Sequence, residues 1–160
     1  MRKVELLCIG KLKEKYWRDA AAEYIKRLQG YCRPAVIELP ECRAPERPNP
    51  AQIATVIERE GEQILAKIPP QAYVIALCIE GKEMDSVALS ELLSARSVAG
   101  DSHLCLVIGG SFGLSDAVKR RADLRLSFSP MTFPHQLARV MALEQLYRAF
   151  QIAAGGRYHK

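Results

Sequence analysis

Short apolar runs along the chain alternate with longer segments in which apolar residues recur at helical spacing. The short runs predict strands over residues 4–9, 35–39, 73–79, 104–108 and 124–128. The longer segments predict helices over residues 13–28, 51–68, 87–97, 116–122 and 135 to about 153. Because strands and helices alternate, the pattern predicts an α/β fold with a parallel-type sheet and helices on both faces.

Residue types at the expected boundaries support these elements. Asn49 and Pro50 suit the start of the second helix, and Ser115 suits the start of the short fourth helix. Pro134 opens the last helix, and two glycines follow it. Four prolines between residues 40 and 50 predict a surface loop or hinge.

Length and composition fit one compact domain over residues 1–160, since 49% of the residues are hydrophobic. The apolar run at the start is too short for a secretory signal, and no stretch approaches the roughly 18 apolar residues that span a bilayer. The five cysteines are an odd number without metal-site spacing. We therefore expect a cytoplasmic protein with reduced cysteines, no membrane association and no metal.

The basic charge is concentrated in the last third. Residues 118–160 carry eight Lys and Arg against two acidic residues, whereas the whole chain has a net charge of only +5. Such a concentration attracts phosphate backbones and indicates a nucleic-acid partner. A solvated basic surface explains the same charge equally well.

A glycine-rich turn, residues 109–113 (GGSFG), follows the predicted strand 104–108. Glycines let a ligand approach the backbone closely, and parallel sheets bind ligands beyond the carboxyl ends of their strands. The turn lacks the spacing of either common phosphate-binding motif, which disfavours an ATP or dinucleotide site. Taken alone, a tight strand-to-helix connection is the simpler interpretation.

A second candidate segment is the loop 127–135 (SFSPMTFPH) after the last strand. Its prolines stiffen it, and its hydroxyls and apolar side chains suit a small ligand with a flat ring and polar edges. A proline-bounded loop that leads into a helix is an equal alternative.

The last helix and the tail carry two further expectations. Leu137, Val140, Met141, Leu146, Tyr147 and Phe150 form a wide apolar arc. Core packing is the default interpretation, and a second subunit could cover part of the arc. Terminal residues are usually frayed, but this tail combines an aromatic ring, an imidazole and cations that could hold a nucleotide. His103 begins a strand, and we expect it at the surface.

Several motifs together resemble one family. They are the strand end Ile9-Gly10-Lys11, the turn 109–113, the S-x-M-T-F-P-H-Q segment at residues 129–136, the helix residues 147–150 and the terminal Tyr158-His159-Lys160. Over essentially the whole chain the sequence is similar to the SPOUT-class large-subunit ribosomal RNA pseudouridine-N3 methyltransferases.

This resemblance implies a trefoil knot within about residues 73–154, a homodimer, and S-adenosylmethionine as cofactor. The implied cofactor contacts are Leu77, Gly110, Ser129, Pro130, Met131, Thr132, Phe133 and Pro134. The implied substrate is ribosomal RNA, free or in the assembled ribosome.

The implied reaction needs little from side chains except alignment, exclusion of water and removal of the proton from the acceptor nitrogen. The catalytic candidates are His135, Tyr158, His159 and Lys160. Arg139 and Arg157 are expected to bind the RNA, Arg139 as a phosphate clamp. We expect the tail to cover the target nucleotide, from its own or the partner subunit.

Two departures from the family pattern are visible. Phe112 stands where a polar residue is expected, and Lys160 replaces the arginine of some relatives, so that a point charge replaces a planar clamp.

Three rival interpretations remain. The chain could be an RNA-binding ribosome assembly factor without catalysis, a nucleotide-binding enzyme of ordinary doubly wound topology, or a SPOUT methyltransferase that acts on another RNA such as transfer RNA.

Overall fold

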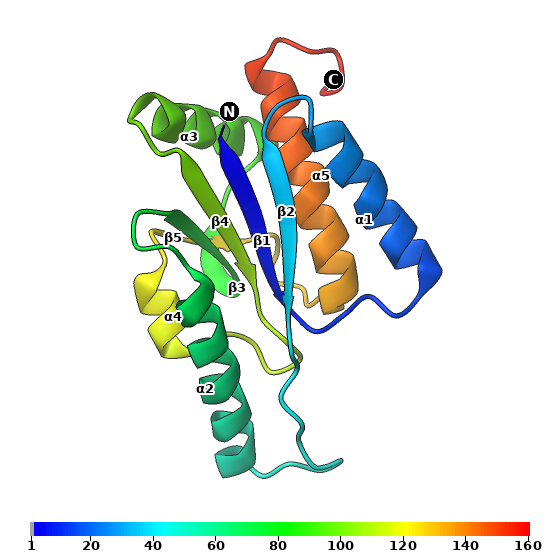
Figure 1. Cartoon of the computed structure of the whole chain (residues 1–160), viewed down its shortest axis with the longest axis vertical. Coiled ribbons are helices and arrows are strands. Elements are labelled where there is room, and N and C mark those ends of the chain that lie inside the picture. Colours follow the sequence, from blue (N-terminus) through cyan, green and yellow to red (C-terminus); the bar gives the residue numbers. More distant parts are fainter. Residues whose placement is uncertain (1) are drawn as a thin grey trace.

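A computed structural model describes residues 2–160, and its centre is one five-stranded sheet (Figure 1). The strands are β1 (Lys3–Ile9), β2 (Arg33–Leu39), β3 (Tyr73–Glu83), β4 (His103–Ile108) and β5 (Leu124–Ser127). Their order is β2-β1-β4-β3-β5, and every neighbouring pair is parallel. The predicted parallel sheet is confirmed.

Five helices cover the two faces of this sheet. They are α1 (Lys15–Leu28), α2 (Pro50–Lys67), α3 (Ser86–Val98), α4 (Asp116–Arg121) and α5 (His135–Ala153). One buried cluster joins the sheet to α1, α3 and α5, and the other joins it to α2 and α4. The predicted helices on both faces are therefore confirmed.

Two helices begin at the capping residues that the sequence predicts. The side chain of Asn49 accepts the N–H of Gln52 at 2.8 Å, and Pro50 occupies the first turn of α2. Ser115 Oγ accepts the N–H of Val118 at 3.2 Å and caps α4. The main difference lies in β3, which continues to Glu83 instead of ending at residue 79.

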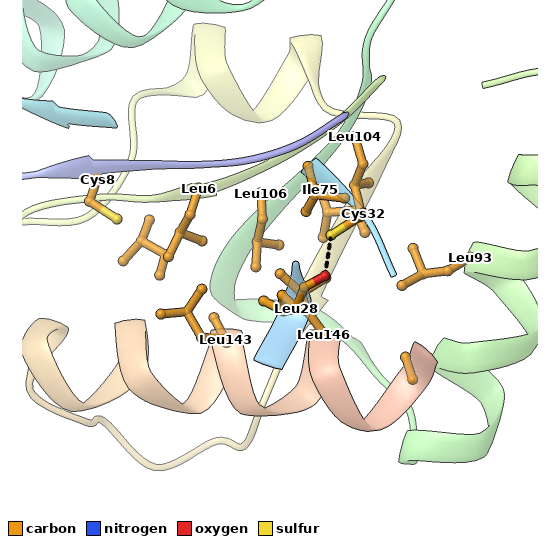
Figure 2. Packing of buried hydrophobic residues seen from close by; sticks show 14 of the residues in the cluster. Leu6, Cys8, Leu28, Cys32, Ile75, Leu93, Leu104, Leu106, Leu143 and Leu146 are labelled. Atoms are coloured by element: carbon orange, nitrogen blue, oxygen red, sulfur yellow. Dashed lines mark hydrogen bonds between the residues drawn. The ribbon is translucent and has the colours of Figure 1, made fainter. Parts of the chain in front are cut away.

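Two inner strands, β1 and β4, are buried almost throughout because helices cover both of their faces. Alternate residues of β1 enter opposite clusters, Leu6 one and Leu7 the other. Figure 2 shows Leu6 and Leu106 of the sheet above Leu143 and Leu146 of α5. Full burial of each such side chain stabilises the fold by about 1.5–3 kcal/mol.

The apolar arc of α5 is only partly used in this core. Leu146 is buried, and Tyr147 and Phe150 pack against the same cluster. Leu137, Val140 and Met141 are only half-buried and, among the described residues, belong to neither cluster. The expected core stripe is thus correct for the second half of α5 and incomplete for the first.

His103 lies in the interior, so its expected surface position is wrong. It is 7% exposed, and its Nε2 lies 2.6 Å from Glu5 Oε2. Lys3 Nζ reaches the other carboxylate oxygen of Glu5 at 2.7 Å. The register explains the contact, because Lys3 is paired with His103 and Glu5 with Cys105 across β1 and β4, which brings these side chains to one face.

The cysteines are free, and Cys8, Cys32 and Cys105 are buried, whereas Cys78 is only partly buried. Burial raises the pKa of the Cys8 thiol to about 12 and that of Cys105 to about 12, which keeps both thiols neutral.

Among the helices of residues 2–160, none combines the length and apolar character that a membrane crossing requires.

The Glu5 cluster predicts a pH-dependent stability. Burial alone would raise the pKa of Glu5, but hydrogen bonds from Lys3 and His103 outweigh burial and lower it. Glu5→Gln should therefore lower the free energy of unfolding by about 2 kcal/mol at neutral pH. The difference should vanish below the lowered pKa, because the wild-type carboxylate is then protonated too. Urea unfolding at about pH 7 and about pH 3 measures both values, and an equal difference at the two pH values would contradict the account.

Candidate functional site

A cavity of about 720 Å³ opens at the carboxyl ends of β3, β4 and β5. Its walls come from residues 77–80 within β3, the glycine turn (residues 109–113), the loop 127–134 and the start of α5. A small-molecule site in a parallel sheet is expected at this edge, and the volume suits one. Both segments that the sequence singled out therefore border one cavity.

The glycine turn is folded tightly against its surroundings. The N–H of Gly113 donates to Gly110 O at 3.1 Å, and Gly113 has a φ of +89°, which disfavours other residues. A Cβ on Gly109 would lie 2.9 Å from the backbone of Gly113. A Cβ on Gly110 would lie 3.0 Å from Glu60 Oε1. Close packing against backbone thus requires glycine at position 109, and at position 110 any side chain would have to displace Glu60.

The loop 127–134 is held by its own hydroxyl groups. Ser127 Oγ donates to Ser129 O at 3.1 Å, and Ser129 Oγ accepts the N–H of Met131 at 3.0 Å. Met131 borders the cavity and remains 72% exposed. A preformed loop with an uncovered apolar side chain suits a ligand that carries a flat ring.

Most of the residues expected to contact a cofactor border this cavity. They are Leu77, Gly110, Ser129, Met131, Thr132, Phe133 and Pro134. Pro130 lies in the same loop, but it is not part of the cavity wall. Phe112 lies on the wall with 38% of its surface exposed, where an aromatic ring enlarges the apolar area.

An ion pair at the cavity was missed by the sequence reasoning. Glu80 Oε1 and Lys119 Nζ form it between β3 and α4, and both residues border the cavity. The hydrogen bond from Lys119 lowers the pKa of Glu80. Glu80 directly follows the strand predicted over residues 73–79, and the sequence gives no signal of its contact with Lys119.

Arg139 differs from its expected position, because it is only 2% exposed. Its Nη1 donates to Glu38 Oε2 at 2.6 Å, and its Nη2 donates to Gly10 O at 3.1 Å. These contacts tie the first turns of α5 to the ends of β1 and β2. A phosphate clamp needs an accessible guanidinium, so Arg139 in this fold is an internal anchor and the expectation is corrected.

His135 borders the cavity one helical turn before Arg139, whereas the tail lies at the other end of α5 (Figure 1). The helix has 19 residues, which corresponds to about 28 Å. Within one chain the structure therefore does not bring His135 together with Tyr158, His159 and Lys160. Arg157 is exposed in the same tail, as a residue that meets RNA must be.

The tail is docked on the outer side of α5. Tyr158 Oη donates to Glu144 Oε1 at 3.2 Å, and the Arg148 guanidinium lies 4.6 Å from the centre of the Tyr158 ring. An Arg148 nitrogen also lies 3.3 Å from His159 Nδ1. Glu144 and Arg148 had not been selected as site residues, although an acid and a base four residues apart inside an apolar arc are a recognisable signal.

These contacts affect the chemistry that the tail could perform. Burial and hydrogen bonds with Tyr24 and Glu144 raise the pKa of Tyr158 to about 12. The phenol is therefore neutral at physiological pH and can donate a hydrogen bond, but it is a poor acceptor of a proton.

A smaller cavity of about 350 Å³ lies beside the first. The two share Ser127 and Phe128, and the smaller one is also bordered by Met141, Glu144 and Gln145 of α5. Helix α5 thus borders both cavities, the larger one at His135 and the smaller one at Met141, Glu144 and Gln145.

Comparisons with known proteins agree on one family. The family model described as "Predicted SPOUT methyltransferase" matches residues 2–159. A protein of Carboxydothermus hydrogenoformans named ribosomal RNA large subunit methyltransferase H is 48% identical over 98% of this chain and 99% of its own length. A protein of Bacillus pumilus with the same name is 50% identical over the same shares of the two chains.

A solved structure supports the same fold. It is titled as a probable methylase family protein from Haemophilus influenzae, and it superposes with a TM-score of 0.54. The match covers 98% of this chain and 70% of that one at 14% identity, so the similarity concerns the fold alone.

The internal position of Arg139 predicts an asymmetry between the two partners of its ion pair. Glu38→Ala leaves a buried cation unpaired and should lower the free energy of unfolding by about 3 kcal/mol. Arg139→Met leaves only the partly exposed Glu38 without its partner, so its cost should be smaller, about 1–2 kcal/mol. Urea unfolding at neutral pH measures both. Glu23→Ala, which removes the exposed pair with Arg27 on α1, is the matched control and should change stability little. Equal costs for Glu38→Ala and Glu23→Ala would refute the internal anchor.

Proposed function

This chain belongs to the SPOUT methyltransferase family, and we propose that it transfers the methyl group of S-adenosylmethionine to N3 of a pseudouridine in large-subunit ribosomal RNA. The observation that carries the proposal is the similarity of about half of all positions, over the full length, to proteins named ribosomal RNA large subunit methyltransferase H. The family uses S-adenosylmethionine, and its fold implies a trefoil knot. We further propose that the protein acts in the cytoplasm and that its substrate is the ribosomal RNA of the assembled ribosome.

The residues of the main cavity fit this cofactor. Gly110 lets a ligand approach the backbone, Leu77 and Phe133 offer apolar surface for a ring, and Thr132 offers a hydroxyl at its edge. The Ser129 hydroxyl is already engaged with the Met131 N–H, so it shapes the loop. We assign the cofactor to this cavity, with Pro130 as a residue that stiffens the loop.

The cofactor supplies a methyl group that is already activated on a sulfonium, so the protein has to align the acceptor and exclude water. The acceptor nitrogen carries a proton that must leave. His135 borders the cavity and can accept a proton, as can His159 of the tail. Tyr158 stays protonated, so we assign it to hydrogen bonding of the target base, with Lys160 and Arg157 beside the RNA.

We propose that the active form is a homodimer in which the tail of one chain serves the cavity of the other. In a single chain the cavity lies at the start of α5, whereas the tail follows the other end and reaches back only to Glu144. Two α5 helices packed antiparallel would bring each tail to the partner's cavity and would cover Leu137, Val140 and Met141. The smaller cavity along Met141 and Glu144 gives a tail a place to enter.

Two complementary variants test the shared site. Deletion of residues 158–160 should abolish methylation and spare cofactor binding, whereas Gly110→Val should abolish cofactor binding through collision with Glu60. Each variant alone is then inactive. When the two variants are co-expressed at equal levels, about half of the dimers should be mixed, and each mixed dimer should hold one complete site of two. About a quarter of the wild-type number of active sites should therefore be restored. Calorimetry with S-adenosylmethionine and a methyl-transfer assay measure these outcomes. Persistent inactivity of well-folded mixed dimers would refute a tail that acts in the partner.

The substrate is tested by mass spectrometry of ribosomal RNA. Cells without the gene should lack one methyl group on a pseudouridine of the large subunit, and the wild-type gene should restore it. The gene with residues 158–160 deleted is the matched control and should not restore it. An unchanged spectrum in the absence of the gene would refute the assignment and would leave RNA binding without catalysis as the better account.

A further inference from the structure

Glu60 of α2 is a buried acid directly beside the cofactor cavity. It is 3% exposed and does not border the cavity itself. Both carboxylate oxygens nevertheless lie against Gly110, which does border it, because a Cβ on Gly110 would be 3.0 and 3.1 Å from them. The carboxyl group therefore fills the space that a side chain at Gly110 would need.

The surroundings of Glu60 offer little compensation for a negative charge. Its Oε2 is buried and, within residues 2–160, has no hydrogen-bond partner. From the loop 40–49, the N–H of Cys42 and the carboxylate of Glu41 face the Glu60 carboxyl group. Its other neighbours are Ile9 of β1 and Gly110 of the glycine turn. Of these neighbours only Glu41 carries a charge, and that charge has the same sign. A buried carboxylate with a single N–H donor and a like charge nearby is costly.

Helix α2 is fixed to the glycine turn at a second point. A Cβ on Gly61 would overlap Oγ of Ser115, the residue that caps α4 immediately after the turn. Gln63 Nε2 also donates to Pro40 O at 3.3 Å, which connects the same helix to the loop 40–49. Helix α2 thus supports the glycine turn on both sides. Glu60 packs against Gly110 within the turn, and Gly61 packs against Ser115 just after it.

We propose that Glu60 is a positioning residue for S-adenosylmethionine, because its carboxyl group supports Gly110 and thereby holds the glycine turn in the shape that the cofactor meets. The proposal rests on the assignment of the cavity to the cofactor. Glu60 acts through the turn and touches neither the cofactor nor the RNA.

The support depends on the protonation of Glu60. Burial, with a smaller contribution from Glu41, raises its pKa to about 7, although the Cys42 N–H acts in the opposite direction. The neutral acid packs against Gly110 without needing water, whereas the ionised group favours an open, hydrated arrangement in which the turn is released. Because the folded pKa is raised, the neutral form prevails below about pH 7 and is lost above it. Cofactor affinity should therefore fall as the pH rises.

Calorimetry of S-adenosylmethionine binding at about pH 6 and about pH 8 tests the proposal. If only the neutral acid holds the turn, the Kd of the wild type should rise about tenfold between these pH values, in proportion to the lost neutral fraction. Glu60→Gln keeps the shape without the ionisation and should lack this rise. The cofactor has its own titrating amino group, so the comparison is between proteins at each pH. Glu62→Gln, at an exposed position of the same helix, is the matched control and should behave like the wild type.

Glu60→Ala removes the support altogether and should weaken binding at both pH values. Should that variant fail to fold, the glutamine variant still decides the matter. An equal pH dependence in the wild type and Glu60→Gln overturns the positioning by Glu60 and leaves the cofactor assignment intact. A wild-type protein that binds no S-adenosylmethionine at either pH overturns the cofactor assignment, and the proposal falls with it.

Discussion

The parallel direction of all five strands is the constraint on which the site depends. Parallel strands end at one edge of the sheet, so residues 77–80 of β3 and the segments that follow β4 and β5 meet there although they are far apart in sequence. The glycine turn and the loop 127–134 each have an ordinary structural explanation when taken singly. Their meeting around one cavity is what makes a ligand site the better explanation for both.

The buried ionisable side chains fall into two groups, which differ in the polar partners around them. Arg139 has Glu38 and Gly10 O as partners, and Glu5 has Lys3 and His103, so both groups stay charged and tie elements of the fold together. Glu60 is buried with only a like charge and a single amide as polar neighbours, so its pKa is raised to about 7 and the neutral form prevails below that pH. Arg139 and Glu5 therefore serve as charged anchors, whereas Glu60 is a support that titrates. The charge state of a buried group depends on its partners as well as on its depth.

The length of α5 governs how the candidate catalytic residues can meet. The cavity lies at the start of α5, whereas the tail leaves its end and reaches back only to Glu144, about 13 Å along the helix from His135. The half-buried apolar residues in its first half and the smaller cavity beside Glu144 lie on the same stretch of helix. The proposed second copy of the chain would explain the separation and the half-buried apolar residues together.

The sequence by itself determined the alternation of strands and helices, the caps at Asn49 and Ser115, and the two segments that border the cavity, because these depend on periodicity and local chemistry. The family motifs then identified the reaction. Only the tertiary structure decided that His103 and Arg139 are internal, that Glu80 reaches the cavity, and that Glu60 supports Gly110. These facts depend on strand order, register and helix docking, which bring together residues from distant parts of the chain and leave no periodic signal along it.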